Sequence, residues 1–255
     1  MKRPTILVSN DDGIHAAGIR ALCESLESWA DVWVVAPETE RSATSHAITL
    51  DRPLRLRQEG PQRFALDGTP VDCVYVGMYG VLEGRMPDIV VAGINHGANL
   101  GSDAFYSGTV GAAREGALRG TMGLAVSLAG HAGSGFGFAA ALATRVVRAM
   151  LARGEHAPRL VSMNIPEGEV RGIRVTTLGK RSYYDQVEAR TDPRGRAYYW
   201  IGGPGSHTEM IPGSDGEAIV QGFATLTALT LDLGLTVSDE RERARVLLAD
   251  LEESR

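Results

Sequence analysis

The chain has 255 residues and a formal net charge of -5 at pH 7, and 44% of its residues are hydrophobic. This composition is typical of a globular protein, and the acidic balance disfavours a nucleic acid polymer as partner without excluding a small phosphorylated ligand. No segment has the roughly 20 apolar residues that cross a bilayer, and the start lacks the apolar stretch of a signal peptide. We therefore expect no membrane association and a cytoplasmic location. The two cysteines, Cys23 and Cys73, lie in apolar helix-like segments, which favours reduced core cysteines over a disulfide.

The first 40 residues predict a strand, a helix and a strand. Residues 5–10 are a short aliphatic run that ends in turn residues, which is typical of a buried strand. Apolar or small residues then recur at helical spacing from Ile14 to Trp29. A second buried run, DVWVVAP, covers residues 31–37. This order indicates a βαβ unit with parallel strands and a right-handed crossover.

The alternation continues to about residue 180. Thr69 and Pro70 resemble an N-cap followed by proline at the first helical position, which predicts a helix through Leu82. The remaining expected elements are strand-like pieces around 48–57 and 63–66, strands at 88–95, 122–129 and 160–166, and helices from Thr109 and across roughly 137–152. Residues 1–180 are therefore predicted to form an α/β core, a Rossmann-like, doubly wound and mostly parallel sheet.

The sequence changes character after residue 180. Tyrosines and branched residues alternate on both sides of the turn sequence 192–195, which predicts a protruding β-hairpin. A strand at 223–231 and a charged helix at 239–253 would complete a C-terminal extension. Because an exposed aromatic hairpin would aggregate alone, we expect residues 181–255 to be an arm and oligomerisation segment of a homo-oligomer. The alternative is that the hairpin folds back on its own domain.

Four polar stretches lie at the carboxyl ends of predicted strands, the edge where an open parallel sheet binds ligands. They are residues 10–13, the loop with Arg41 and Ser42, residues 93–95 and residues 107–109. Asp11 and Asp12, with a hydroxyl and an amide oxygen, would make an all-oxygen site for Mg²⁺ or Mn²⁺. The alternative is a simple turn in which Asp12 caps the next helix. His15 lies at the mouth of this helix, where it is either a proton donor or an ordinary surface residue.

A second pattern indicates an anion site. Ser107-Gly108-Thr109 opens a predicted helix, whose free N–H groups and positive dipole end attract a phosphate. A plain Ser/Thr cap is the alternative. A cation site and an anion site on one edge would suit hydrolysis of a phosphate ester. Motifs of other enzyme classes are missing from the sequence: the dinucleotide fingerprint, the P-loop, the G-x-S-x-G elbow and H-E-x-x-H.

These segments together resemble the SurE family of stationary-phase survival proteins, which have nucleotide phosphatase activity. The resemblance covers nearly the whole chain, in the order NDDGIHAAGI, VVAPETERSATSHAITL, LDGTPVDCVYVG, PDIVVAGINHGANLG, YSGTVGAAREGAL, DPRGRAYYWIGG and PGSDGEAIVQGFATLTALTLDL. Four positions depart from the family pattern. Ala17 stands where proline is frequent, His46 where asparagine is common, His96 in place of a small residue and Ala98 in place of a proline.

The resemblance implies residue roles. One divalent cation per subunit, Mg²⁺ or Mn²⁺, would be held by Asp11, Asp12, Ser42 and Asn95. The phosphate pocket would fall on Asn99, Ser107, Gly108 and Thr109. The implied activity is hydrolysis of nucleoside 5′- and 3′-monophosphates, and in some members of short polyphosphate, by a homodimer or homotetramer.

We expect Asp11 or Asp12 to take the proton of the attacking water, or to attack directly, and His15 to assist the leaving group. Two alternatives from other classes are a non-catalytic nucleotide- or phosphate-binding regulator on the same fold and a structural oligomer built around the hairpin.

Overall fold

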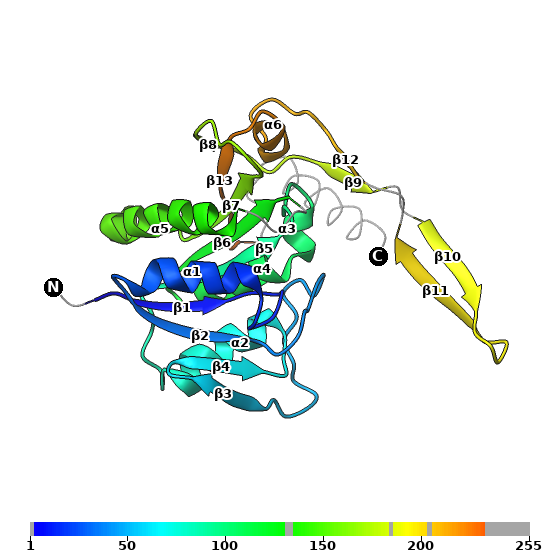
Figure 1. The fold of residues 1–255 in the computed structure, drawn as a ribbon, viewed down its shortest axis with the longest axis horizontal. Helices are drawn as coiled ribbons and strands as arrows, with labels where there is room; N and C mark the ends of the chain where they lie inside the picture. Colours follow the sequence, from blue (N-terminus) through cyan, green and yellow to red (C-terminus); the bar gives the residue numbers. More distant parts are fainter. Residues whose placement is uncertain (1–2, 131–134, 184–185, 203–205, 233–255) are drawn as a thin grey trace, which may run out of the picture.

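A nine-stranded sheet forms the centre of the computed structural model, which describes residues 3–130, 135–183, 186–202 and 206–232 (Figure 1). The strand order is β3-β4-β2-β1-β5-β6-β7-β13-β8. The strands are β1 (Thr5–Ser9), β2 (Asp31–Pro37), β3 (Leu56–Gly60), β4 (Arg63–Leu66), β5 (Ile89–His96), β6 (Met122–Ala129), β7 (Leu160–Pro166), β8 (Ile173–Val175) and β13 (Ala224–Ala228). Six neighbouring strands run parallel, in the order β4-β2-β1-β5-β6-β7. The strand β3 is antiparallel to β4, and β13 is antiparallel to β7. The predicted mostly parallel α/β fold is confirmed.

Helices cover both faces of the sheet. On one face α1 (Ala17–Glu27) packs against α5 (Phe136–Arg153). On the other face α2 (Pro70–Val76), with its π-helical extension η1 (Gly77–Val81), packs against α4 (Gly108–Leu118). The short elements are α3 (Asp103–Tyr106), η2 (Gly154–His156) and α6 (Asp215–Val220). Of the described helices, none is long and apolar enough to cross a membrane.

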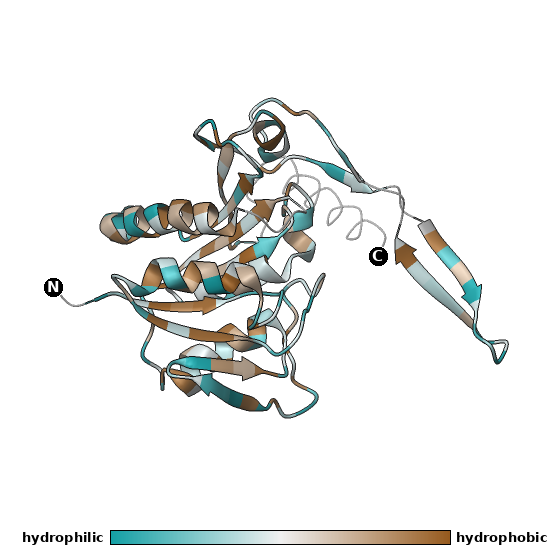
Figure 2. Cartoon of the chain, in the orientation of Figure 1, coloured by the Kyte–Doolittle hydropathy of each residue, from teal (hydrophilic) through white to brown (hydrophobic). Residues whose placement is uncertain are grey.

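The two-sided burial of the central strands explains their continuous apolar sequence. Ile6 and Val8 of β1 face the α1 side and Leu7 faces the α2 side, and all three are fully buried. Each such side chain contributes roughly 1.5–3 kcal/mol on leaving water. Figure 2 shows the same apolar character along the central strands. Cys23 and Cys73 are free and buried in the two opposite core clusters, as predicted.

Local signals placed some elements and missed others. Thr69 caps α2 in a capping box with Asp72, and Pro70 is the first helical residue, as predicted. Two boundaries were wrong: α1 begins at Ala17 rather than Ile14, and residues 48–55 form no strand because β3 begins only at Leu56. The helices α3 and α6 were not predicted. The expected helix at 239–253 lies outside the described residues.

The predicted hairpin is confirmed as an arm that projects from the core (Figure 1). Its strands β10 (Gln186–Thr191) and β11 (Ala197–Gly202) are antiparallel, and Trp200 is 60% exposed. At its root β9 (Arg181–Tyr183) pairs with β12 (Ser206–Thr208). The chain leaves the sheet near residue 180 and returns through β13, so the segment after 180 contributes to the sheet as well as to the arm.

Candidate metal and phosphate site

A cavity opens at the point where the strand order reverses. Within the sheet, β2 is the neighbour of β1 on one edge and β5 is its neighbour on the other edge. The loops that follow β1 and β5 therefore run in opposite directions and leave a space between them. The cavity has a volume of about 730 Å³. Its lining includes, of the predicted residues, Asp11, Asp12, Ser42, Asn95, Asn99 and Ser107. Stretches from four different loops thus meet in one cavity, as the sequence predicted.

Asp11 is held by the start of α4. Its side chain is buried, and it accepts hydrogen bonds from the backbone N–H of Thr109, at 3.0 Å, and from the Thr109 hydroxyl. The positive end of the helix dipole also favours a carboxylate at this point. Burial nevertheless raises the pKa of Asp11, and the two bonds from Thr109 offset only part of that cost. A buried, oriented carboxylate results, with its negative charge incompletely compensated.

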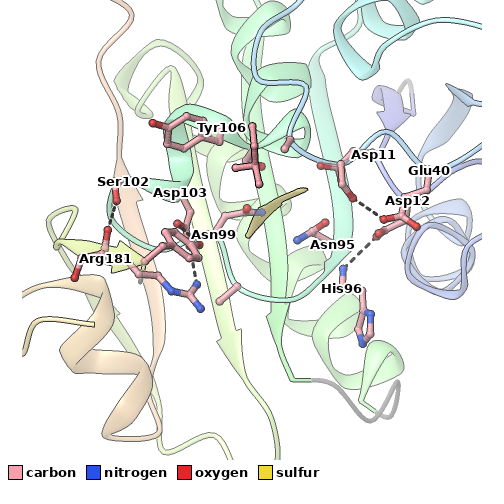
Figure 3. Close-up of a pocket in the computed structure, with 17 residues that line it drawn as sticks. Asp11, Asp12, Glu40, Asn95, His96, Asn99, Ser102, Asp103, Tyr106 and Arg181 are labelled. Carbon is pink, nitrogen blue, oxygen red and sulfur yellow. Dashed lines mark hydrogen bonds and ion pairs between the residues drawn. The ribbon is translucent and has the colours of Figure 1, made fainter. Parts of the chain in front are cut away.

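Asp12 is less anchored. One of its oxygens accepts the backbone N–H of His96 at 3.1 Å (Figure 3). Burial, followed by repulsion from Asp11, raises the pKa of Asp12 to about 6. The protein therefore places two like charges side by side in a poorly solvated position, an arrangement that a bound cation stabilises.

Asn95 and Ser42 add neutral oxygens to the aspartates. The amide nitrogen of Asn95 donates to the carbonyl of Gly97 at 2.8 Å, which orients the side chain and leaves its carbonyl oxygen as an acceptor. Ser42 lies on the loop after β2 and donates to Glu40 at 2.6 Å. The β5 backbone before Asn95 needs glycine, because a Cβ atom at Gly93 would lie 2.4 Å from the carbonyl oxygen of Val126.

This donor set fits a hard divalent cation. Two carboxylates, one hydroxyl and one amide carbonyl are oxygen ligands of the kind that Mg²⁺ and Mn²⁺ prefer. Within the described part of the chain, no three acidic, histidine or cysteine side chains converge as a metal cluster. Asp11, Asp12, Ser42 and Asn95 are the residues of the cavity that could hold such an ion.

The start of α4 offers a place for an anion beside the aspartates. Ser107 caps the helix by accepting the N–H of Val110 at 3.1 Å, and its hydroxyl proton remains available to a ligand. Gly108 lets the start of α4 lie close to the loops of Thr44 and Asp11. A Cβ atom at Gly108 would lie 2.9 Å from the Thr44 hydroxyl and 3.0 Å from Cβ of Asp11. Asn99 is fixed in the wall by a 2.8 Å bond to Ser127.

Two predicted site residues have different surroundings. Thr109, expected to bind phosphate, is fully buried, gives its backbone N–H and its hydroxyl to Asp11 and does not line the cavity. His15 is exposed and lines a separate pocket of about 320 Å³ with Ile14, Arg20 and Arg63. The structure therefore does not bring His15 to the aspartates, because the turn after Gly13 carries it outward before α1 begins.

Several residues of the cavity wall were not predicted from the sequence. They include Glu40, Asp103, Tyr106, Arg181 and Tyr183. His46, which departs from the family pattern, does not line the cavity. Its ring forms a hydrogen bond with Glu115 of α4 at 2.9 Å. The tyrosine-rich start of the arm was the one available signal, and it was interpreted as an oligomerisation surface.

Comparisons with known proteins identify the family. The family model "Survival protein SurE" matches residues 6–185. The 5′-nucleotidase SurE of Anaeromyxobacter dehalogenans (strain 2CP-C) is 54% identical over 89% of this chain and 90% of its own length. The corresponding protein of Sorangium cellulosum (strain So ce56) is 49% identical over 91% of each chain. The crystal structure of the SurE protein from Aquifex aeolicus superposes with a TM-score of 0.79 at 38% identity, covering 91% of this chain and 95% of that one. The chain belongs to the SurE family.

Proposed function

We propose that this protein is a divalent-metal-dependent phosphomonoesterase that hydrolyses nucleoside monophosphates, as a 5′-nucleotidase, to nucleoside and phosphate. The observation that carries the proposal is the meeting of Asp11 and Asp12 with the N-terminus of α4 in one cavity. The name 5′-nucleotidase borne by relatives at about half identity supports the same activity. Action on 3′-monophosphates and short polyphosphate extends the same chemistry.

Asp11, Asp12, Ser42 and Asn95 would hold one Mg²⁺ or Mn²⁺. When bound, the cation neutralises phosphoryl charge and activates water. Asn99, Ser107 and the α4 backbone at Gly108 would bind the phosphoryl oxygens and stabilise the charge that develops on them.

The two aspartates take different roles in this proposal. Both oxygens of Asp11 accept hydrogen bonds from Thr109, so Asp11 serves as a fixed anchor. Asp12 receives the N–H of His96 on one oxygen. Its other oxygen would accept the proton of an attacking water or attack the phosphorus. We therefore assign the proton acceptor, or direct nucleophile, to Asp12 and no role to His15.

Phosphate release from a panel of mononucleotides tests the activity. Wild-type protein should release phosphate with Mn²⁺ or Mg²⁺, lose this activity in EDTA and regain it on metal addition. Asp11→Asn and Asp12→Asn should each lower kcat at least 100-fold with an unchanged far-UV circular dichroism spectrum. A metal-independent wild-type enzyme, or a fully active Asp12→Asn variant, contradicts the proposal. Nucleotide binding without phosphate release would instead support the alternative regulator.

We also propose that the arm joins subunits into a homodimer or homotetramer in the cytoplasm. The exposed Tyr199, Trp200 and Val187 support a covered surface on the arm, and the two free cysteines fit a reducing compartment. Light scattering should give a multiple of the 27.2 kDa chain, and Trp200→Asp should lower it. A monomeric wild-type protein would contradict the assembly.

A further inference from the structure

The cavity extends well past the metal and phosphate residues. Its volume of about 730 Å³ lies within the range of about 300–1,000 Å³ that holds small organic ligands, whereas the aspartates and the α4 N-terminus occupy one end of it. Figure 3 shows Asp103, Tyr106 and Arg181 on the side opposite Asp11 and Asp12, with Asn95 and Asn99 between the two groups. The far wall also includes Tyr183 and Ile201 from the two sides of the arm.

This far wall is rigidly built. Asp103 is 7% exposed and accepts hydrogen bonds from the Arg181 guanidinium and from the Tyr183 hydroxyl, both at 2.6 Å. The same guanidinium lies 5.6 Å from the centre of the Tyr183 ring. Ser102 donates to the backbone carbonyl of Arg181 at 2.7 Å. These contacts fix the root of the arm against α3, so a ligand would find the wall already arranged and would lose little free energy in ordering it.

The wall presents the surface that a nucleoside needs. Tyr106 and Tyr183 keep 65% and 48% of their surface exposed although they line the cavity. Nucleobases stack on aromatic rings, whereas a phosphate does not, and the Arg181 guanidinium is already paired with Asp103. Burial, followed by the hydrogen bond to Asp103, raises the pKa of Tyr183 to about 12, so its hydroxyl stays a donor to that carboxylate at physiological pH.

We propose that Tyr106, Arg181 and Tyr183 form the nucleoside subsite, in which the base stacks on the tyrosine rings while the phosphate lies at Asp12 and Ser107. The inference rests on the proposed nucleotidase function and adds a role for the arm, whose root supplies one wall of the substrate site. The tyrosines then determine the preference for nucleotides over other phosphate esters.

Two measurements test the subsite. The first is calorimetric titration of the full-length, Mn²⁺-loaded protein with adenosine and, separately, with inorganic phosphate. The second is the ratio of kcat/KM for AMP to that for β-glycerophosphate, which has no base. The variants are Tyr106→Ala, Tyr183→Ala and Tyr183→Phe, which keeps the ring and removes the bond to Asp103. Tyr79→Ala is the matched control, since Tyr79 is 43% exposed and does not line the cavity.

Both alanine variants should weaken adenosine binding about tenfold and lower the AMP preference by a similar factor. Phosphate affinity and kcat/KM for β-glycerophosphate should stay within twofold, Tyr183→Phe should retain most of the binding, and Tyr79→Ala should match wild type. Unchanged adenosine binding in both alanine variants, or an equal loss for phosphate and adenosine, overturns the subsite. If wild-type protein hydrolyses neither ester, the proposed function fails, and the adenosine titration still decides the subsite.

Discussion

Thr109 donates both its backbone N–H and its hydroxyl to the carboxylate of Asp11, across 98 residues of sequence. The first turn of α4 therefore orients an expected metal ligand while Ser107, two residues earlier, faces the cavity. The metal and phosphate sub-sites thus share the N-terminus of α4. A substitution of Thr109 tests the metal sub-site, and a substitution of Ser107 tests the phosphate sub-site.

Thr109→Val should weaken metal binding rather than phosphate binding. It removes a hydrogen bond to a charged acceptor, worth about 1.5–3 kcal/mol, which corresponds to a Kd for Mn²⁺ roughly 10- to 100-fold higher. Electron paramagnetic resonance of free Mn²⁺ measures this constant, and Thr109→Ser should restore most of the affinity. Ser107→Ala is the counterpart: it should leave Mn²⁺ affinity within twofold and weaken inhibition by inorganic phosphate. A reversed pattern would show that the two sub-sites are assigned wrongly.

Removal of metal should make Asp12 a source of instability. Asp11 and Asp12 are adjacent and poorly solvated, so in EDTA the substitution Asp12→Asn relieves their repulsion. We expect a Tm a few °C above wild type in EDTA, since about 1 kcal/mol shifts a protein of this size by roughly 2–4 °C. Adding Mn²⁺ should raise the Tm of wild type but not that of the variant. Equal metal-induced shifts in scanning calorimetry would argue against a cation at these residues.

Gly111→Ala should disturb the loop that carries Ser42. A Cβ atom at Gly111 would lie 2.4 Å from the carbonyl oxygen of Ser45, and that loop also bonds the backbone of Tyr106 through Ser45 at 2.8 Å. We expect a lower Tm and at least tenfold weaker Mn²⁺ binding. Gly137→Ala in α5 is the control, because among the described residues no atom outside its own stretch of helix lies within 4 Å of its Cβ position. The control should be neutral or stabilise by up to about 1 kcal/mol. Full Mn²⁺ affinity in Gly111→Ala would show that the loop adapts.

Glu115 should give the protein a stability that is lost in acid. It is 2% exposed and accepts hydrogen bonds from His46 at 2.9 Å and Arg119 at 2.7 Å. Burial alone would raise the pKa of Glu115, but these two partners outweigh it and lower the pKa below its ordinary 4.5. Its contribution is therefore fully present above about pH 4.5, where the unfolded carboxyl is ionised, and disappears as the pH falls through the lower folded value.

Urea unfolding of wild type and Glu115→Gln between pH 7 and pH 3 measures this contribution. At pH 7 the variant should be about 1–3 kcal/mol less stable, and the difference should shrink below pH 4.5. His46→Asn removes one partner and raises the pKa of Glu115, so its loss of stability should begin at higher pH than in wild type. A difference independent of pH would mean that Glu115 stabilises by packing alone.

The sequence by itself determined the elements and the edge at which they meet. Local patterns predicted the apolar runs of β1 and β5, the cap at Thr69 and the turn of the arm. Each of these patterns depends only on residues that are close together in the sequence. The positions of Asp11, Asp12 and Asn95 at the carboxyl ends of parallel strands were enough to predict a shared cavity, because such strands end at the same edge of the sheet.

Tertiary structure alone decided which groups touch. Thr109 donates to Asp11 and does not line the cavity, and His15 lines a separate pocket because Gly13, at a φ of 96°, turns the chain before α1 begins. The wall of Tyr106 and Arg181 joins segments about 75 residues apart, through a carboxylate at Asp103 that no local pattern marks. Periodicity describes a residue's own strand or helix, whereas the direction of a side chain across a cavity depends on how distant elements pack.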